Sequence, residues 1–310
     1  MAPLLLPDSE SVRVRASGKI NLGLKVGPVR EDGYHPLANV FQAVSIFDEL
    51  QAQWAPPGEV RISIAGEQAH LVPADERNLA VRAARLLVSE FGDPAVHGVS
   101  LALRKAIPVT GGMAGGSADA AAALLACSVL WDLDTSPDEL RDLGAMLGAD
   151  VPFSLLGGTA LGTGRGDRLA PVLSRGTYHW VLAFSDGELS TPEVFGRFDE
   201  LNPGLNAEPE VPRAVMNALV SGDPAALGRA LSNDLQPAAL SLRPGLAQVL
   251  EVGVELGALA GLVSGSGPTC AFLAANEAAA IDLSVKLSSE GLCRAIRRVT
   301  GPVPGARIIT

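Results

Sequence analysis

Pro108-Val109-Thr110-Gly111-Gly112-Met113-Ala114-Gly115-Gly116-Ser117-Ala118 runs directly into an alanine-rich segment, residues 119–130, whose composition predicts a helix. The glycines of this stretch let the backbone adopt positive φ angles and approach a ligand closely. A helix that starts here presents unpaired N–H groups and the positive end of its dipole to an anion. We therefore interpret the stretch as a phosphate-binding loop, which indicates nucleotide chemistry.

The loop matches neither of two common phosphate-binding motifs. No Lys-Ser or Lys-Thr pair follows its last glycine, as a P-loop requires, and its glycines break the spacing of a dinucleotide fingerprint. A glycine-rich turn ahead of a helix also occurs as tightly packed scaffold. The stretch alone leaves both interpretations open.

Composition indicates a globular chain with two domains. A chain of 310 residues with 47% hydrophobic residues can fill two ordinary cores, and we expect mixed α and β structure at residues 1–170 and 171–310. A net charge of −10 argues against a nucleic-acid partner and against an anionic membrane surface, because both need basic patches.

Cysteine usage and the N-terminus indicate a cytoplasmic protein. Cys127, Cys270 and Cys293 are far apart and odd in number, which gives no disulfide framework and no metal-ligand spacing. Residues 1–7 lack the basic segment and the long apolar run of a signal peptide. Residues 256–276 carry no charge over a length that could span a bilayer, but a Gly-Ser-Gly-Pro break favours helix, short strand, loop and buried strand.

Alternation of apolar with polar or small residues predicts half-buried strands at residues 12–14 and 20–26. The polar face of the second segment holds Lys19, Asn21, Gly23 and Lys25. Further strands are predicted at residues 99–103, 159–161 and 180–184.

Two helices have clear boundary signals. Residues 78–91 form an amphipathic pattern that stops at Gly92, with an apolar stripe made of Leu79, Leu86, Leu87 and Phe91. Ser136-Pro137-Asp138-Glu139 is a capping box, so a helix runs from there to Gly148 and places Asp150 in a turn just past its end. Other helices are predicted at residues 211–220, 225–231 and 244–256.

Lys19 and Asp150 are the candidate catalytic pair. Phosphoryl transfer to an alcohol needs charge neutralisation on the transferring group and help in removing the hydroxyl proton. Asp150 could accept that proton, and Lys19 could lower the pKa of the carboxylate or stabilise the developing alkoxide directly. The alternatives are a solvated strand lysine and a turn aspartate bonded to its own backbone.

Tyr34 and His35 follow Gly33 in a turn, where an aromatic ring tends to be exposed and can stack on a base. The alternative is a packing tyrosine and a buried, hydrogen-bonded histidine. His70, His97 and His179 have no clustered partner, and we interpret them as structural.

Three segments together resemble one family. The Pro-x-x-x-Gly-x-x-Gly-Gly-Ser pattern of residues 108–117, with Lys105 ahead of it, resembles the ATP loop of the GHMP kinases (galactokinase, homoserine kinase, mevalonate kinase and relatives). Residues 16–24 and 261–271 resemble the first and third motifs of that superfamily. The sequence departs from it at Met113, Ala114 and Ala118, where relatives more often carry Leu, Gly and Ser.

The resemblance implies an α+β fold with an N-terminal ATP-binding domain like domain 2 of ribosomal protein S5 and a C-terminal ferredoxin-like domain. It implies ATP and Mg²⁺ as cofactors and Lys19 and Asp150 as catalytic residues. The implied ATP-binding residues are Asn78, Lys105, Pro108, Val109, Thr110, Gly111, Gly112, Met113, Ala114, Gly115, Gly116, Ser117 and Ala118. Asn78 is also a natural helix N-cap, and Ser117 is either a ligand of Mg²⁺ or phosphate or a helix N-cap.

Residues 32–35 and 147–153 match more narrowly a branch whose alcohol substrate carries a cytidine diphosphate. This resemblance implies that Tyr34 and Phe195 stack on the base and that His35 reads its edge. The implied substrate-binding residues are Asn21, Tyr34, His35, Thr191 and Phe195, and Ser266 and Gly267 would close the site from the second domain.

The sequence thus predicts an ATP- and Mg²⁺-dependent kinase for a small cytidyl diphosphate sugar alcohol. Two alternatives are another GHMP kinase, such as homoserine kinase, and a nucleotide-binding regulator without catalytic activity. We expect a small-molecule substrate, no nucleic-acid or membrane partner, and a monomer or weak homodimer.

Overall fold

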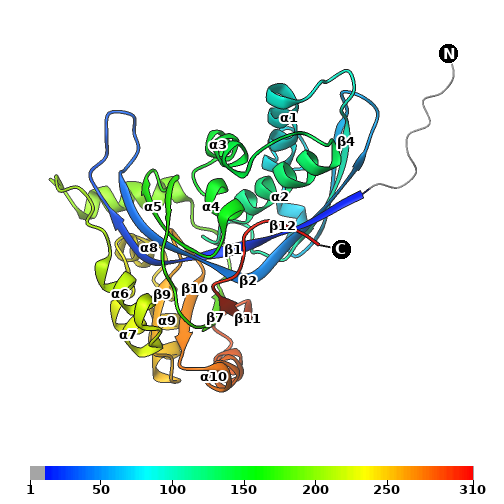
Figure 1. Cartoon of the computed structure of the whole chain (residues 1–310). Coiled ribbons are helices and arrows are strands. Elements are labelled where there is room, and N and C mark those ends of the chain that lie inside the picture. The colour runs from blue at the N-terminus through cyan, green and yellow to red at the C-terminus, as the bar shows by residue number, and fades with distance from the viewer. Residues whose placement is uncertain (1–10, 310) are drawn as a thin grey trace, which may run out of the picture.

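The computed structural model describes residues 11–309, so the N-terminal residues considered for a signal peptide lie outside the described part. Within it, two sheets and their helices form two layered halves (Figure 1). The order of elements mixes helices and strands in both halves, which confirms the predicted α+β class.

The first sheet is built around a long hairpin. Its strands are β1 (Ser11–Val26) and β2 (Leu37–Trp54), and the sheet order is β12-β1-β2-β4-β3, with β5 and β8 attached further along the hairpin. The other strands are β3 (Val60–Gly66), β4 (Val99–Lys105), β5 (Thr159–Gly164), β6 (Arg168–Pro171), β8 (Ser232–Asn233) and β12 (Arg307–Ile308).

The two strand segments predicted at the start of the chain are one strand, β1. Bulges between Ser17 and Gly18 and between Asn21 and Gly23 shift its register against β2, and such bulges bend a strand. The prediction of a half-buried strand is confirmed at residues 12–14, where the exposed Arg13 precedes the buried Val14. It is wrong around Lys19 and Asn21, because the polar face is covered there too, and these residues are 6% and 2% exposed.

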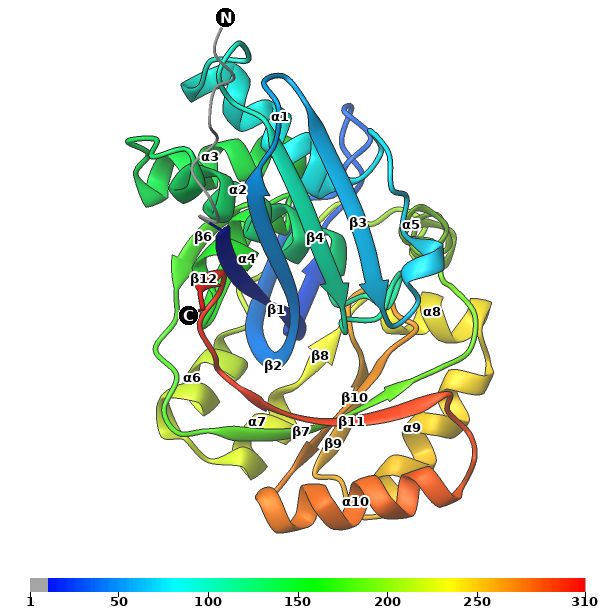
Figure 2. The same ribbon diagram turned by 90° about the vertical axis from the view of Figure 1, so that its right-hand side faces the viewer.

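Helices cover the face of this sheet that carries the apolar residues (Figures 1 and 2). They are α1 (Leu79–Phe91), α2 (Gly115–Leu130), α3 (Pro137–Leu147) and α4 (Val151–Leu156), and a short 3-10 turn, η1 (Ala69–Leu71), precedes α1. Asn78 caps α1, and the predicted capping box starts α3, with Glu139 closing on Ser136. The predicted apolar stripe of α1 is partly wrong, because Phe91 is 37% exposed and small residues such as Ala83 and Ala84 pack instead.

The helix α2 begins four residues before the predicted start. Ala114 holds a left-handed φ of 60°, which turns the chain so that Gly115 is already helical. Ser117 therefore lies inside the first turn of α2, and the alternative that it is the N-cap is wrong. Because α2 is largely alanine and is buried on nearly all sides, it packs closely against α1, β1 and β2.

The second half is an antiparallel sheet of order β11-β7-β10-β9 with helices around it. Its strands are β7 (Tyr178–Phe184), β9 (Ala260–Val263), β10 (Cys270–Ala274) and β11 (Ala295–Gly301). Its helices are α5 (Thr191–Leu201), α6 (Arg213–Ser221), α7 (Pro224–Ala230), α8 (Gln236–Leu242), α9 (Gly245–Glu255) and α10 (Glu277–Ser289). Residues 260–274 form the predicted short strand, loop and buried strand, but the helix predicted for the start of the 256–276 segment ends at Glu255, just before it. No helix between residues 11 and 309 is long and apolar enough to cross a membrane.

The halves are not sequential along the chain. The strand β8 pairs with β1, and the C-terminal segment runs from β11 back to the first sheet, where β12 pairs with β1 (Figure 2). A boundary near residue 170 stays a prediction, and residues on both sides of it share the largest core cluster.

Candidate active site

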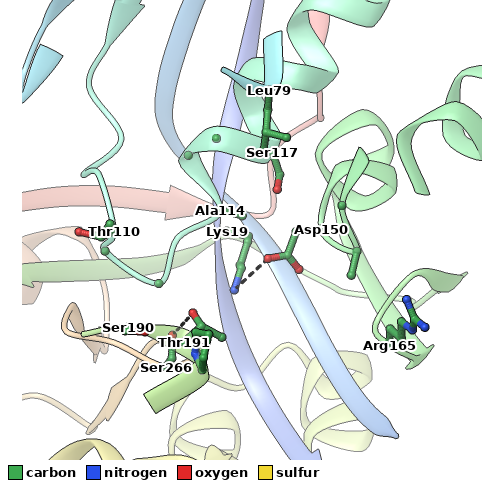
Figure 3. A pocket seen from close by; sticks show the side chains of 18 of the residues that line it. Lys19, Leu79, Thr110, Ala114, Ser117, Asp150, Arg165, Ser190, Thr191 and Ser266 are labelled. Atoms are coloured by element: carbon green, nitrogen blue, oxygen red, sulfur yellow. Dashed lines mark hydrogen bonds and ion pairs between the residues drawn. The ribbon is translucent and has the colours of Figure 1, made fainter. Parts of the chain in front are cut away.

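One cavity of about 1130 Å³ lies where the two halves meet, and most of the predicted site residues line it. One end is bounded by the glycine loop and the start of α1, and the other by the β1–β2 turn and α5. Lys19 and Asp150 lie between these two ends (Figure 3).

The glycine loop is held in an open, left-handed path. Thr110, Gly112 and Ala114 all have positive φ angles, and the backbone N–H groups at the start of α2 follow directly. Gly112 approaches the loop at residues 264–267 so closely that a Cβ there would clash with the carbonyl oxygen of Ser264. The hydroxyl of Ser264 donates to the carbonyl of Gly112 at 3.1 Å, so the second half of the molecule supports the loop.

Lys19 reaches the cavity from the covered face of β1. Its Nζ donates to Asn21 Oδ1 at 2.9 Å and lies 3.8 Å from Asp150 Oδ2, and its backbone N–H donates to the carbonyl of Met113 at 3.1 Å. The same strand therefore positions the ammonium and anchors the glycine loop. The alternative of a solvated lysine is wrong, because only 7% of the side chain is exposed.

Asp150 occupies the turn between α3 and α4. Gly148 ends α3, and the carbonyl of Gly148 accepts the N–H of Val151, while Pro152 lies in the first turn of α4. The carboxylate makes no capping bond to α4 and is instead directed toward Lys19, with a third of the side chain exposed (Figure 3). An ion pair with a carboxylate that solvent and substrate can still reach is suited to proton transfer from an alcohol.

At the far end, the β1–β2 turn carries Tyr34 and His35. Asp32 Oδ1 accepts the N–H of Tyr34 at 3.0 Å, and the tyrosine ring is half exposed. His35 is buried, and its Nδ1 is 2.8 Å from the carbonyl oxygen of Gly27. Because a carbonyl only accepts, Nδ1 carries a proton, and Nε2 is the atom that lies 3.5 Å from Asp199 Oδ2.

The helix α5 presents one face to this turn. Thr191, Phe195 and Asp199 recur every four residues and all line the cavity. The ring of Phe195 stacks on His35 at a centroid distance of 5.0 Å, and Thr191 Oγ1 is 3.0 Å from Ser266 Oγ. The face of Tyr34 is covered by the guanidinium of Arg165, 3.8 Å from the ring centroid.

A buried ionic triad lies behind the glycine loop. Lys105 Nζ pairs with Asp48 and lies 2.7 Å from Asp119 Oδ2, and Asp48 Oδ1 also accepts the N–H groups of Ala106 and Ile107. Burial lowers the pKa of Lys105, but Asp119 and Asp48 outweigh it and raise the net value. Burial, followed by the charge of Asp48, raises the pKa of Asp119 well above its usual range.

The other predicted ATP residues fall into two groups. Most line the cavity, including Pro108, Thr110, Gly116 and Ser117. Met113 and Ala118 have their side chains in the core, fully buried and away from the cavity lining. Both ends of the Asn78 amide are used locally, since Oδ1 accepts from Ala80 N–H and Nδ2 donates to the carbonyl of Pro73, so the N-cap role is the one observed.

Comparison with known proteins identifies the family. Residues 78–158 match the GHMP kinases N terminal domain, and residues 215–292 match the GHMP kinases C terminal domain. A 4-diphosphocytidyl-2-C-methyl-D-erythritol kinase from Mycolicibacterium smegmatis is 54% identical over 303 residues, which cover 96% of this chain and 92% of the relative. The chain belongs to the 4-diphosphocytidyl-2-C-methyl-D-erythritol kinase family of GHMP kinases.

Other comparisons agree with this family. The kinase of the same name from Rhodococcus jostii is 54% identical over 300 residues, with 96% of this chain and 95% of the relative covered. A crystal structure of 4-(cytidine 5'-diphospho)-2C-methyl-D-erythritol kinase superposes with a TM-score of 0.74 at 33% identity, covering 93% of this chain and 98% of that one. Homoserine kinase from Cytophaga hutchinsonii has a TM-score of 0.76 at 19% identity, covering 99% and 100%, which shows a shared fold alone.

For this member of the 4-diphosphocytidyl-2-C-methyl-D-erythritol kinase family, sequence reasoning missed Asp48, Asp119, Arg165 and Asp199. Asp199 had a usable signal, because it follows Phe195 by one helical turn. Arg165 lies between Gly164 and Gly166, both with positive φ, in a turn between two strands. Asp167 and Arg168 follow directly, so charge alone did not distinguish Arg165. Asp48 had no local signal, since its partner Lys105 is distant in sequence.

Proposed function

We propose that this chain transfers the γ-phosphoryl group of ATP to the 2-hydroxyl of 4-diphosphocytidyl-2-C-methyl-D-erythritol, giving the 2-phosphate and ADP. This reaction belongs to the methylerythritol phosphate route to isoprenoid precursors. The family membership supports the proposal across nearly the whole chain.

The observation that carries the proposal is the Lys19–Asp150 pair, placed between two differently built ends of one cavity. At one end, glycines and the start of α2 offer N–H groups to phosphates. At the other, aromatic rings and polar side chains offer a surface for a base. A phosphoryl donor at the first end and a nucleotide-linked alcohol at the second would meet at the pair.

In the proposed reaction, Asp150 accepts the proton of the attacking hydroxyl and Lys19 balances the negative charge that develops. The bond from Lys19 to Asn21 fixes the ammonium toward Asp150. The loop at residues 264–267 packs over the glycine loop and helps to exclude water from the transferring group.

ATP and Mg²⁺ are the proposed cofactors. Between residues 11 and 309 there is no group of three His, Cys, Asp or Glu side chains that could hold a metal by itself, so the ATP phosphates would supply most ligands. Two residues at the start of α2 fit an ion held in this way. Ser117 lines the cavity, and the buried Asp119 Oδ1 has no hydrogen-bond partner in the described chain. Mg²⁺ would neutralise charge on the phosphates during transfer.

For the cytidyl end, we propose that Tyr34 and Phe195 stack on the cytosine and that His35 reads its edge through Nε2. Asn21 and Thr191 complete the substrate-binding set and lie on the cavity wall. The protein is further proposed to be cytoplasmic and to act as a monomer or weak homodimer.

Release of ADP, measured with a panel of alcohols, tests the proposed function. We expect turnover with 4-diphosphocytidyl-2-C-methyl-D-erythritol and none above background with homoserine or mevalonate. Turnover with homoserine instead would favour the alternative GHMP kinase. ATP binding without turnover of any alcohol would favour the non-catalytic regulator.

A further inference from the structure

Arg165 lies in the turn between β5 and β6 and reaches back to the β1–β2 turn. Its guanidinium covers one face of Tyr34, and its Nη2 is 3.1 Å from Asp32 Oδ2. The backbone N–H of Arg165 donates to Asp167 Oδ1 at 3.2 Å, which fixes the turn. About half of the side chain is exposed, and it lines the cavity on the far side of Asp150 from Thr110 (Figure 3).

The other lysine and arginine side chains on the cavity wall, within residues 11–309, already lie against carboxylates of the protein. Lys105 is enclosed by two carboxylates, and Lys19 lies at the reacting centre beside Asp150. Arg77 makes three hydrogen bonds to Asp75, next to Asn78 at the nucleotide end. Arg165 uses one guanidinium nitrogen in its side-chain bond to Asp32, which leaves most of its five N–H donors free.

The diphosphate of the proposed substrate has to be bound by this part of the cavity wall. This group joins the cytidine to the sugar alcohol, so it must lie between the base site at Tyr34 and the reacting hydroxyl at Asp150. The negative charge of a diphosphate held there favours a cation on the wall, and a guanidinium binds two phosphate oxygens in parallel.

We propose that Arg165 binds the diphosphate of the alcohol substrate and is a specificity-determining residue of this enzyme. The inference rests on the proposed function. The guanidinium occupies one face of the Tyr34 ring, so the base stacks on the other face, and a single side chain links recognition of the base to recognition of the diphosphate.

Calorimetric binding of cytidine, CMP and CDP to four proteins tests the role of Arg165. These are the wild type, Arg165→Ala, Arg165→Lys and Arg168→Ala, the last being an exposed arginine of the same hairpin that does not line the cavity. In the wild type, affinity should rise with each phosphate. In Arg165→Ala, the affinity for CDP should fall about 10-fold or more, the scale of a hydrogen bond to a charged group. The affinity for cytidine should fall less than about 3-fold.

Arg165→Lys should retain part of the affinity for CDP, because an ammonium keeps the charge without the two parallel bonds. Arg168→Ala should match the wild type. With the full substrate, Arg165→Ala should raise the KM of the alcohol and leave the KM of ATP and kcat nearly unchanged, because the diphosphate does not react.

Two results would overturn the inference. An equal loss of affinity for cytidine and for CDP would mean that Arg165 acts only by supporting Tyr34. An unchanged affinity for CDP would mean that Arg165 has no role in binding the diphosphate. If the wild type bound none of the three cytidine ligands, the proposed function itself would fail and the inference with it. Wild-type binding of CDP with an unaffected Arg165→Ala variant would contradict the inference alone.

Discussion

A nearly buried ammonium beside a partly exposed carboxylate forms the proposed reacting centre. Lys19 has its charge partner 3.8 Å away, and that partner, Asp150, is open to the cavity. The distance is long for a direct hydrogen bond, so Asp150 can take a proton from a ligand without first breaking a tight contact. The two side chains come from different layers of the fold, Lys19 from β1 and Asp150 from the turn between α3 and α4.

Asp150→Asn and Lys19→Ala should each lower kcat by at least ~100-fold while the protein stays folded, the usual scale for a positioned proton acceptor. The double variant should lose little more than either single one, because paired groups act as a unit. Steady-state kinetics and circular dichroism of all three proteins provide the check. Near-normal turnover by folded Asp150→Asn would exclude Asp150 from the mechanism.

Tyr34→Ala should raise the KM of the cytidyl substrate roughly 5- to 150-fold, because stacking on an aromatic ring contributes ~1–3 kcal/mol per base. The KM of ATP should barely move, since Tyr34 lies at the opposite end of the cavity from the glycine loop. CMP should compete with the alcohol and not with ATP in inhibition kinetics. Competition of CMP against ATP alone would contradict the assignment of the two ends.

At the scale of elements, the glycine loop and α2 act as one unit. The left-handed Ala114 starts α2 early, and the loop is supported by β1 on one side and by residues 264–267 on the other. An alanine in this conformation costs roughly 1–2 kcal/mol. The fold tolerates that strain because the backbone on both sides is fixed.

Gly116→Val should abolish ATP binding and leave the fold intact. A Cβ at Gly116 would meet only Leu79, at 3.4 Å, so the fold can accept it, while the added methyl groups would block the approach of phosphate. Gly245→Val, at the first residue of α9 with open space around it, is the control for valine at a helix start. Calorimetry measures the affinity of both variants for ATP. An unchanged affinity in Gly116→Val would mean that the loop is structural scaffold and does not bind phosphate.

Local signals predicted elements such as α1, α3 and β4, but missed others, among them β2, α5 and α10. Contacts between distant segments were missed as well. The capping box at Ser136 and the N-cap at Asn78 depend on residues two or three positions away, so they could be predicted correctly. Lys19 and Asn21 could be placed on one face by alternation, but their burial comes from segments packed over that face. Asp48 is far from Lys105 in sequence, and no local pattern connects the two residues. The ionic triad centred on Lys105 was therefore missed.

At the scale of the whole molecule, this triad joins β2, β4 and α2. The titration of Asp119 should make stability depend on pH. The folded pKa of Asp119 is raised, so the folded state binds the proton more strongly than the unfolded chain, where the pKa is about 3.9. The contribution of Asp119 to stability therefore falls as pH rises from about 4 through its folded pKa.

Asp119→Asn cannot titrate, so this fall should be flatter in the variant than in the wild type. Urea unfolding at several pH values from about 4 to 8 measures the free energy of unfolding and its slope. Asp134→Asn, at an exposed position, should keep the wild-type slope. The same slope in Asp119→Asn would show that Asp119 keeps an ordinary pKa in the folded protein.

The return of the C-terminal segment to the first sheet affects how the protein matures in the cell. The backbone N–H of Val303 donates to the carbonyl of Ala43, β12 pairs with β1, and the N–H of Ile309 donates to the carbonyl of Arg13. A ribosome makes these late residues after every strand that they join. The edge of β1 that pairs with β12 therefore stays open in the nascent chain until residues 303–309 have been made.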